Sequence, residues 1–257
     1  MDLPVDPFKI AEREGIVVRA KKTTTPGVSG LLMKVGDTFG IMYAMHLSND
    51  GFIRFTVSHE LGHYFLPGHA EHLFAGGVTL HESHSGFISH DQYEIEADSF
   101  AASLLMPPKL FRQAMRNAGI GFTAIETLTD TCRTSITATA IRYATHTDDP
   151  VAVVVSPSDR IDYCFMSENL KNIRGLQWIR KGELLPNDTA TWRFNRDPAN
   201  IESRERVESA CSLDDWFDGA PDLEVNEDVV GLGSYGKTLT VLFSDEPIDG
   251  EDYEDDD

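Results

Sequence analysis

The sequence has few cysteines and no long apolar run, and each shortage excludes a class of protein. Three cysteines among 257 residues, widely spaced and odd in number, predict neither a disulfide framework nor a zinc site built from CxxC pairs. No stretch of about 18 apolar residues is present, so we expect no membrane span and no membrane partner. The first residues contain no basic region followed by an apolar stretch, which predicts no signal peptide. Together these absences predict a protein of the reducing cytoplasm.

Basic residues are also scarce, since 22 lysines and arginines stand against 42 aspartates and glutamates and give a net charge of −20. Phosphate contacts need clustered lysine and arginine, so we expect no direct binding to nucleic acid. The excess is concentrated at the end of the chain, because residues 212–257 carry −15 and residues 1–146 only −3. We expect residues 246–257 to form a disordered acidic tail; the alternative is a tail that binds a basic partner.

The pattern of the first half predicts an α+β domain with helical and strand segments in alternation. Residues 67–90 contain many glycines and histidines and are expected to form one long connection. The segments expected are a helix at 6–14, strands at 15–22 and within 31–45, and helices at 52–66, 91–106, 108–118, 123–131 and 135–146.

The helix expected over 52–66 contains the sequence HELGH at positions 59–63. Residues four apart lie on one helical face, so the imidazoles of His59 and His63 can bind one metal ion. Glu60 lies beside them and can hold a water molecule bound to that ion. The HExxH pattern is typical of zinc peptidases and predicts a Zn²⁺ cofactor, with Glu60 in the catalytic role.

The helix expected over 91–106 offers carboxylates for the third ligand that a catalytic zinc ion needs. Glu94 and Asp98 are four residues apart and share a helical face, so one can bind the metal while the other orients a ligand histidine. We favour Glu94 as the ligand and Asp98 as the orienting group. Glu96 is the alternative ligand, although it points to another side of the helix. Without the histidines, a solvated helix face would explain these carboxylates better.

Two segments, FTVSHELGH at 55–63 and EIEADSFAASLLMP at 94–107, resemble the ImmA/IrrE metallopeptidases, and the resemblance covers roughly residues 10–145. It implies that His59, His63 and Glu94 bind zinc and that Glu60 is the general base. It also implies a cytoplasmic endopeptidase of zincin-like fold that cleaves a helix-turn-helix repressor and so releases silenced genes. Similar IrrE-like and CapP-type members continue with a helical region and a C-terminal GAF-like domain.

The second half changes to a strand-rich pattern after residue 147, which predicts a domain boundary there. We expect a zincin-like domain over 1–147, including the helical region 107–146, and a regulatory α+β domain over 148–245. The second domain has the layout of a GAF-like sensor for a small-molecule or nucleic-acid-derived signal. Its expected strands lie at 151–156, 160–166, 189–194, 223–232 and 237–243, with a helix around 200–211.

Several further residues are candidates for roles that the sequence leaves open. A donor to the oxyanion is needed, and the candidates are Tyr93, His90, His84 and His81. A thiol that closes the metal site is a hypothesis for Cys164, Cys132 and Cys211; buried, inert cysteine is the alternative. The strand Phe39–Ala44 is expected to be the sheet edge that binds an extended substrate. Residues 123–146 have the length of a helix-turn-helix but few basic residues, so packing on the core is favoured over DNA binding.

These observations predict a zinc-dependent endopeptidase whose substrate is a helix-turn-helix repressor of stress, mobile-element or phage-defence genes. The alternative is a non-catalytic, zinc-containing regulatory protein that acts on a transcription factor without cleavage. A fourth protein ligand at the metal would favour this alternative.

Overall fold

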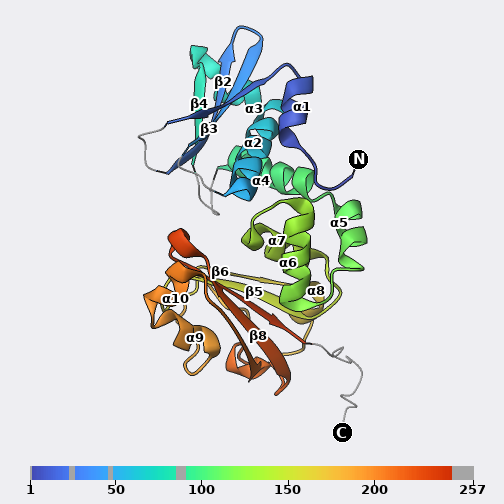
Figure 1. Cartoon of the computed structure of the whole chain (residues 1–257), viewed down its shortest axis with the longest axis vertical. Coiled ribbons are helices and arrows are strands. Elements are labelled where there is room, and N and C mark those ends of the chain that lie inside the picture. The colour runs from blue at the N-terminus through green and yellow to red at the C-terminus, as the bar shows by residue number, and fades with distance from the viewer. Residues whose placement is uncertain (1, 23–26, 46–48, 85–90, 245–257) are drawn as a thin grey trace. The chain divides into compact units, whose positions relative to one another are not determined.

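The computed structural model describes residues 2–22, 27–45, 49–84 and 91–244 of the chain. Helices and strands both contribute to the fold, which confirms the predicted α+β class (Figure 1). His90 and the acidic segment 246–257 lie outside the described residues. In the described part of the chain, no helix is both long enough and apolar enough to cross a lipid bilayer.

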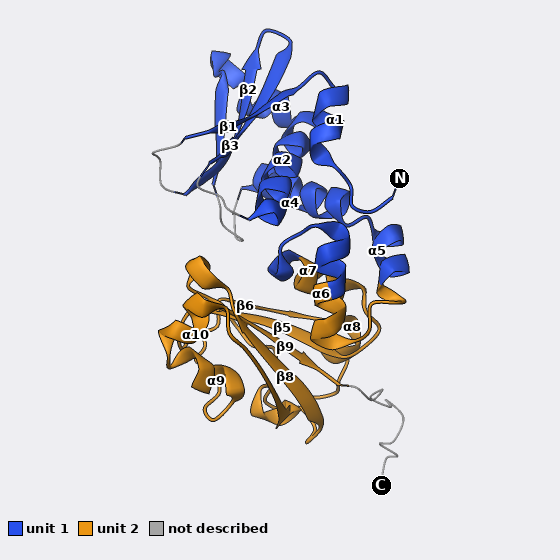
Figure 2. Ribbon diagram, viewed as in Figure 1, with its two compact units in different colours: residues 1–114, 127–138 blue, residues 115–126, 139–257 orange. Residues whose placement is uncertain are grey.

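The chain forms two compact units, of residues 1–114 with 127–138 and of residues 115–126 with 139–257 (Figure 2). The region expected to be helical over 107–146 therefore contributes to both units. It contains α5 (Pro108–Met115), α6 (Gly121–Cys132) and α7 (Ile136–His146). A compact unit need not fold on its own, so the predicted domains 1–147 and 148–245 stay a prediction.

The start of α6 belongs to the second unit because its side chains contact the strands there. Glu126 forms an ion pair with Arg206 at 3.1 Å, and the guanidinium of Arg206 lies 4.4 Å from the ring centre of Phe122. The ring of Phe243 fills the space that a Cβ atom at Gly121 would need. These contacts join residues that are more than 75 positions apart in the chain, which a local sequence pattern cannot show.

Within the described residues, four strands form the sheet of the first unit in the order β1-β3-β2-β4. Strand β1 runs parallel to β3, whereas β2 runs antiparallel to both β3 and β4. The strands are β1 (Val17–Lys21), β2 (Val28–Val35), β3 (Thr38–Ala44) and β4 (Leu80–His84). The β2-β3 turn uses Gly36 at a φ of 61°, a conformation that glycine adopts without steric cost.

This sheet corrects two predictions. The segment 67–90 is not one long connection, because it contains α3 (His69–Leu73), a 3₁₀ turn at Ala75–Gly77 and strand β4. Residues Phe39–Ala44 are not a sheet edge, because β3 pairs with β1 on one side and with β2 on the other. The edges of this sheet are β1 and β4.

Helix α2 (Asp50–Phe65) is buried on nearly every side and contains the HELGH segment. One side packs on the sheet through Val57 and Leu61, in the same apolar core as the short helix α1 (Pro7–Arg13). Another side packs on α4 (Gln92–Leu105), where a Cβ atom at Gly62 would lie 3.1 Å from the Cα of Ala97. This close approach of the two helices brings their polar side chains together.

In the second unit, five of the described strands form an antiparallel sheet in the order β6-β5-β9-β8-β7. The inner strand β5 is buried along its whole length and packs in an apolar core with Trp216 and Phe217. The likeness of this unit to a GAF domain stays a prediction. The strands are β5 (Val151–Ser156), β6 (Tyr163–Met166), β7 (Arg206–Ser212), β8 (Glu224–Gly231) and β9 (Thr238–Phe243).

Two predictions for the second unit are wrong. Residues 189–194, expected to be a strand, form helix α9 (Ala190–Asn195), and the side chain of Thr189 caps it by accepting a hydrogen bond from the Trp192 amide. The helix expected around 200–211 is only α10 (Pro198–Ser203). Arg204 ends it with a φ of 59°, and the chain continues as β7.

Candidate metal centre

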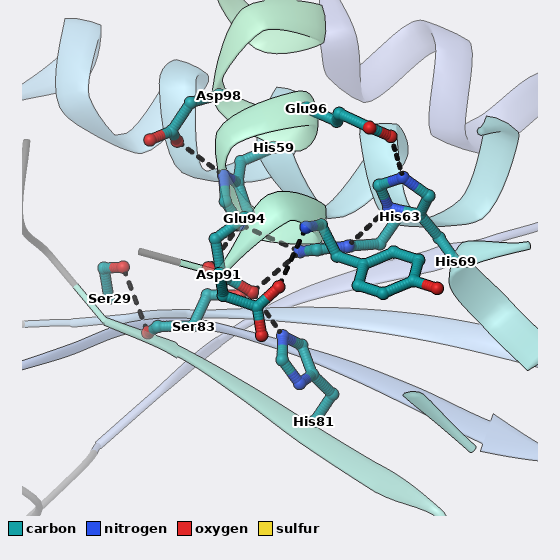
Figure 3. A network of polar contacts seen from close by, with 11 residues as sticks. Ser29, His59, His63, His69, His81, Ser83, Asp91, Glu94, Glu96 and Asp98 are labelled. Atoms are coloured by element: carbon teal, nitrogen blue, oxygen red, sulfur yellow. Dashed lines mark hydrogen bonds and ion pairs between the residues drawn. The ribbon is translucent and has the colours of Figure 1, made fainter. Parts of the chain in front are cut away.

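Helices α2 and α4 bring three side chains together at one point: His59 and His63 from α2, and Glu94 from α4 (Figure 3). The Nε2 atoms of the two histidines are 3.0 Å apart. The carboxylate of Glu94 lies 3.3 Å from His59 Nε2 and 3.2 Å from His63 Nε2. One ligand atom from each of the three residues lies within 4.8 Å of the others.

The donor set of two imidazole nitrogens and one carboxylate oxygen is that of a catalytic zinc site. In the described part of the chain, no fourth histidine, cysteine or acidic residue joins this group at the same distances. A site with three protein ligands leaves a coordination position for water or substrate. The residues present therefore fit a catalytic rather than a purely structural zinc ion.

Hydrogen bonds from the surrounding histidines stabilise the charged form of Glu94. Burial would raise the pKa of Glu94, but hydrogen bonds from His59, His63 and His81 outweigh it and hold the pKa well below its usual range. Burial would likewise lower the pKa of His59, but hydrogen bonds to Asp98 and Glu94 raise it to about 10. A proton on His59 thus provides positive charge at the position where a cation would bind.

Glu60 is fully buried beside this group, and neither carboxylate oxygen has a hydrogen-bond partner among the described residues. Burial raises the pKa of Glu60 to about 7, and the nearby His59 and Ser83 offset only part of this effect. Buried polar groups without partners are rare in folded proteins and need an explanation. A water molecule at the metal centre would supply the missing partner.

A glycine on the sheet provides the room for Glu60. A Cβ atom at Gly30 on β2 would overlap the carboxylate of Glu60 and would lie 2.6 Å from the methyl group of Thr56. Any larger residue at position 30 would therefore displace Glu60 from its place.

Asp98 lies where the sequence predicts an orienting group. Its Oδ1 accepts a hydrogen bond from His59 Nδ1 at 2.8 Å, so the Nε2 atom of His59 is left for the metal. Glu96, the alternative ligand, lies elsewhere: its Oε2 is 3.0 Å from Nε2 of His69. His69 was not among the residues predicted for the site, and its position six residues after His63 was the available signal.

The candidate oxyanion donors lie in different places. On β4, His81 reaches the centre, with its Nε2 3.0 Å from Glu94 Oε1 and its ring 4.9 Å from that of His63. Tyr93 instead stacks on His72 at 4.1 Å between ring centres. His84 is exposed at the end of β4. Among the described candidates, only His81 contacts a side chain of the group of His59, His63 and Glu94.

All three cysteines are free thiols, of which Cys132 is buried and Cys164 and Cys211 are partly buried. Burial raises the pKa of Cys132 to about 11, and burial raises those of Cys164 and Cys211 to about 12. The thiols are therefore protonated at neutral pH, whereas a metal ligand must be a thiolate. This favours the reading of inert cysteines over a thiol switch.

Comparison with known proteins agrees with the geometry of the site. Residues 11–129 match the model of the peptidase M78 family, described as the IrrE N-terminal-like domain. A solved structure of a Mycobacterium tuberculosis transcriptional regulator has a similar fold, with a TM-score of 0.56 and 14% sequence identity. The similarity covers 93% of this chain and 69% of the regulator chain. At that identity the likeness concerns the fold alone. The comparison with curated proteins found no match. Residues 11–129 of this chain therefore belong to the ImmA/IrrE metallopeptidase family.

Proposed function

We propose that the chain is a zinc-dependent endopeptidase with its active site between α2, α4 and β4. The observation that carries this proposal is the unpaired, fully buried carboxylate of Glu60 beside a three-residue ligand set. A protein that kept the metal only for structure would gain nothing from such a carboxylate, because burying it without a partner costs stability.

Different residues of the site bind the metal ion, orient a ligand and transfer the proton. His59, His63 and Glu94 hold the ion, and Asp98 fixes the ring of His59. A bound zinc ion supplies a Lewis acid and lowers the pKa of a coordinated water molecule to about 7. Glu60, whose own pKa is raised to about 7 by burial, takes a proton from the attacking water and returns it to the leaving amine.

His81 is the proposed donor to the oxyanion of the substrate. Its Nε2 is hydrogen-bonded to Glu94, but His81 does not belong to the ligand group, so this nitrogen would become available to a bound carbonyl oxygen once Glu94 binds the metal. Strand β4, which carries His81, is an edge of its sheet, and its outer side offers backbone groups to an extended peptide. The substrate segment would then lie antiparallel or parallel to β4 and across the metal centre.

The proposed substrate is a helix-turn-helix repressor, and cleavage would release stress, mobile-element or phage-defence genes. Membership of the ImmA/IrrE family supports this choice. We also propose that the second unit receives a small-molecule or nucleic-acid-derived signal. A pocket of about 830 Å³ in this unit, lined by Trp178, Arg180, Leu184 and Trp216 among others, supports that role.

The test is co-expression with candidate helix-turn-helix repressors, including any encoded by a neighbouring gene, followed by analysis of their fragments. Glu60→Gln should lower the cleavage rate by about 10²- to 10⁴-fold, because proton transfer is lost while the ligands remain. Its zinc content should stay that of the wild type. Glu12→Gln, the same change at an exposed position of α1, is the control and should cleave normally.

Two outcomes would change the proposal. Unchanged cleavage by Glu60→Gln would remove Glu60 from the mechanism. Intact repressor with the wild type, together with bound zinc and altered repressor activity, would support the alternative of a non-catalytic zinc-containing regulator.

A further inference from the structure

A chain of polar contacts runs away from the metal centre behind His63 (Figure 3). His63 Nδ1 lies 3.1 Å from His69 Nδ1, and His69 Nε2 lies 3.0 Å from Glu96 Oε2. The other oxygen of Glu96 accepts a hydrogen bond from Gln92 at 2.7 Å. His63 and His69 are fully buried, whereas the side chain of Glu96 is 45% exposed.

The direction of these hydrogen bonds follows from metal binding. A neutral histidine that binds a metal through Nε2 carries its proton on Nδ1. His63 Nδ1 therefore donates, and His69 Nδ1 must accept. The proton of neutral His69 is then on Nε2, where the carboxylate of Glu96 accepts it. In each of these two contacts one atom donates a proton and the other accepts it.

The fold places His69 for this contact. Gly68 precedes α3 with a φ of 85°, a left-handed conformation that suits glycine, and the chain reverses there after α2. Helix α3 starts at His69, whose ring meets the ring of Tyr93 edge-on at 4.9 Å. The imidazole is thus held by packing as well as by its two polar contacts.

The two ligand histidines are supported in different ways. His59 donates directly to a carboxylate, Asp98, at 2.8 Å. His63 reaches a carboxylate only through a second imidazole. In both cases the outer ring nitrogen is fixed, which sets the orientation and the tautomer of the ligand.

We propose that His69, backed by Glu96, is a positioning residue that orients His63 for metal binding. This inference rests on the proposed metal site but not on the proposed cleavage, because it predicts zinc affinity directly. Partners of this kind typically change metal affinity by 10- to 100-fold when they are removed.

The test measures zinc affinity by competition with a chromophoric chelator, using the full chain. His69→Leu lacks an acceptor and should weaken zinc binding by about 10- to 100-fold. His69→Asn can place a carbonyl oxygen where Nδ1 lies, and should recover most of the affinity. His72→Leu is the matched control: it changes the same helix and also touches Tyr93, and should bind zinc like the wild type.

A core histidine with no role at the metal would give another pattern. His69→Leu and His69→Asn would then bind zinc as tightly as the wild type, and this result would overturn the proposal. If His69→Leu does not fold, Glu96→Ala decides, because it removes the acceptor of His69 at a half-exposed position where the loss should not affect folding. Weaker zinc binding by Glu96→Ala would support the proposed role of His69 and Glu96, and unchanged binding would overturn it.

A failure of the proposed cleavage would give a different result from a failure of the proposed role of His69. A wild type that binds zinc but cleaves nothing leaves the affinity comparison intact, since no step of it uses cleavage. A wild type that binds no zinc removes the metal site itself, and with it both proposals. Cobalt(II) in place of zinc gives a second readout, because its visible spectrum reports the geometry of the ligands and should shift in His69→Leu.

Discussion

Among the residues that the structure describes, each unit contains one fully buried glutamate, and the two differ in their hydrogen bonding. Glu227 on β8 accepts hydrogen bonds from the Ala190 amide at 2.9 Å and from both the amide and the hydroxyl of Thr191 at 2.7 Å. Glu60 on α2 accepts none among the described residues. Both are 0% exposed, so burial does not explain the difference.

The hydrogen bonds of Glu227 indicate a role in the fold, whereas Glu60 lacks such bonds. Glu227 fixes the start of α9 to the sheet, where the free amides of a helix N-terminus favour a negative charge. Its burial is offset by the three hydrogen bonds that it accepts. Glu60 has no such compensation, and a group that costs stability at a fixed position is expected where the position serves a reaction.

The largest effect is expected from Glu227→Gln. The amide side chain keeps one acceptor oxygen but presents an NH₂ group to the donors of α9, so the variant should lose about 2–4 kcal/mol of unfolding free energy. Denaturant titration measures this loss. Zinc affinity should not change, and a stable Glu227→Gln would mean that the three hydrogen bonds contribute little.

The same substitution at Glu60 is expected to have the opposite sign. The folded pKa of about 7 lies above the ordinary value of 4.5, so the contribution of Glu60 to stability is present below pH 4.5 and is lost as the pH rises through about 7. Metal-free Glu60→Gln should therefore gain about 1–3 kcal/mol relative to wild type between pH 4.5 and pH 8. Chemical unfolding with a chelator present, at both pH values, checks this; a variant less stable than wild type at pH 8 contradicts it.

Asp228, the neighbour of Glu227, has fewer hydrogen-bonding partners than Glu227 and more than Glu60. Its substitution should give the smallest change in unfolding free energy. It is buried with one partner, Arg206, at 3.5 Å. Burial raises the pKa of Asp228 to about 6, and Arg206 lowers it only in part. Its contribution to stability is present below pH 3.8 and is lost as the pH rises through about 6.

Asp228→Asn should remove this pH dependence. The difference in unfolding free energy between wild type and variant should change by about 1 kcal/mol between pH 3.8 and pH 7, in favour of the variant at the higher pH. A difference that stays constant over this range would mean that Arg206 pairs fully with Asp228 in the fold.

The sequence predicted the part of the site that depends on helical periodicity. His59 and His63 on α2, and Glu94 and Asp98 on α4, are spaced by four, and that spacing alone places each pair on one face. Their meeting depends on the packing of Gly62 against Ala97, which no local pattern shows.

The sequence did not predict the elements that depend on distant partners. The segment LHESH of β4 has one apolar residue in five and becomes a strand only by pairing with β2 about 50 residues earlier. The alternation in TATWRF looks like a strand, but Glu227, more than 30 residues later, binds the first amides of α9. His69 was missed for the same reason, because it lies in the segment 67–90 that was expected to be a connection. His81, in the same segment, was one of four candidate oxyanion donors that the sequence could not rank.

The absence of a side chain at Gly30 links the residue at position 30 to the glutamate at position 60. A methyl group there would meet the carboxylate of Glu60 and the methyl of Thr56, so a glutamate can occupy position 60 in this way only while position 30 stays glycine. Substitution at position 30 is therefore expected to move the carboxylate of Glu60, although the two residues lie 30 positions apart and belong to different elements.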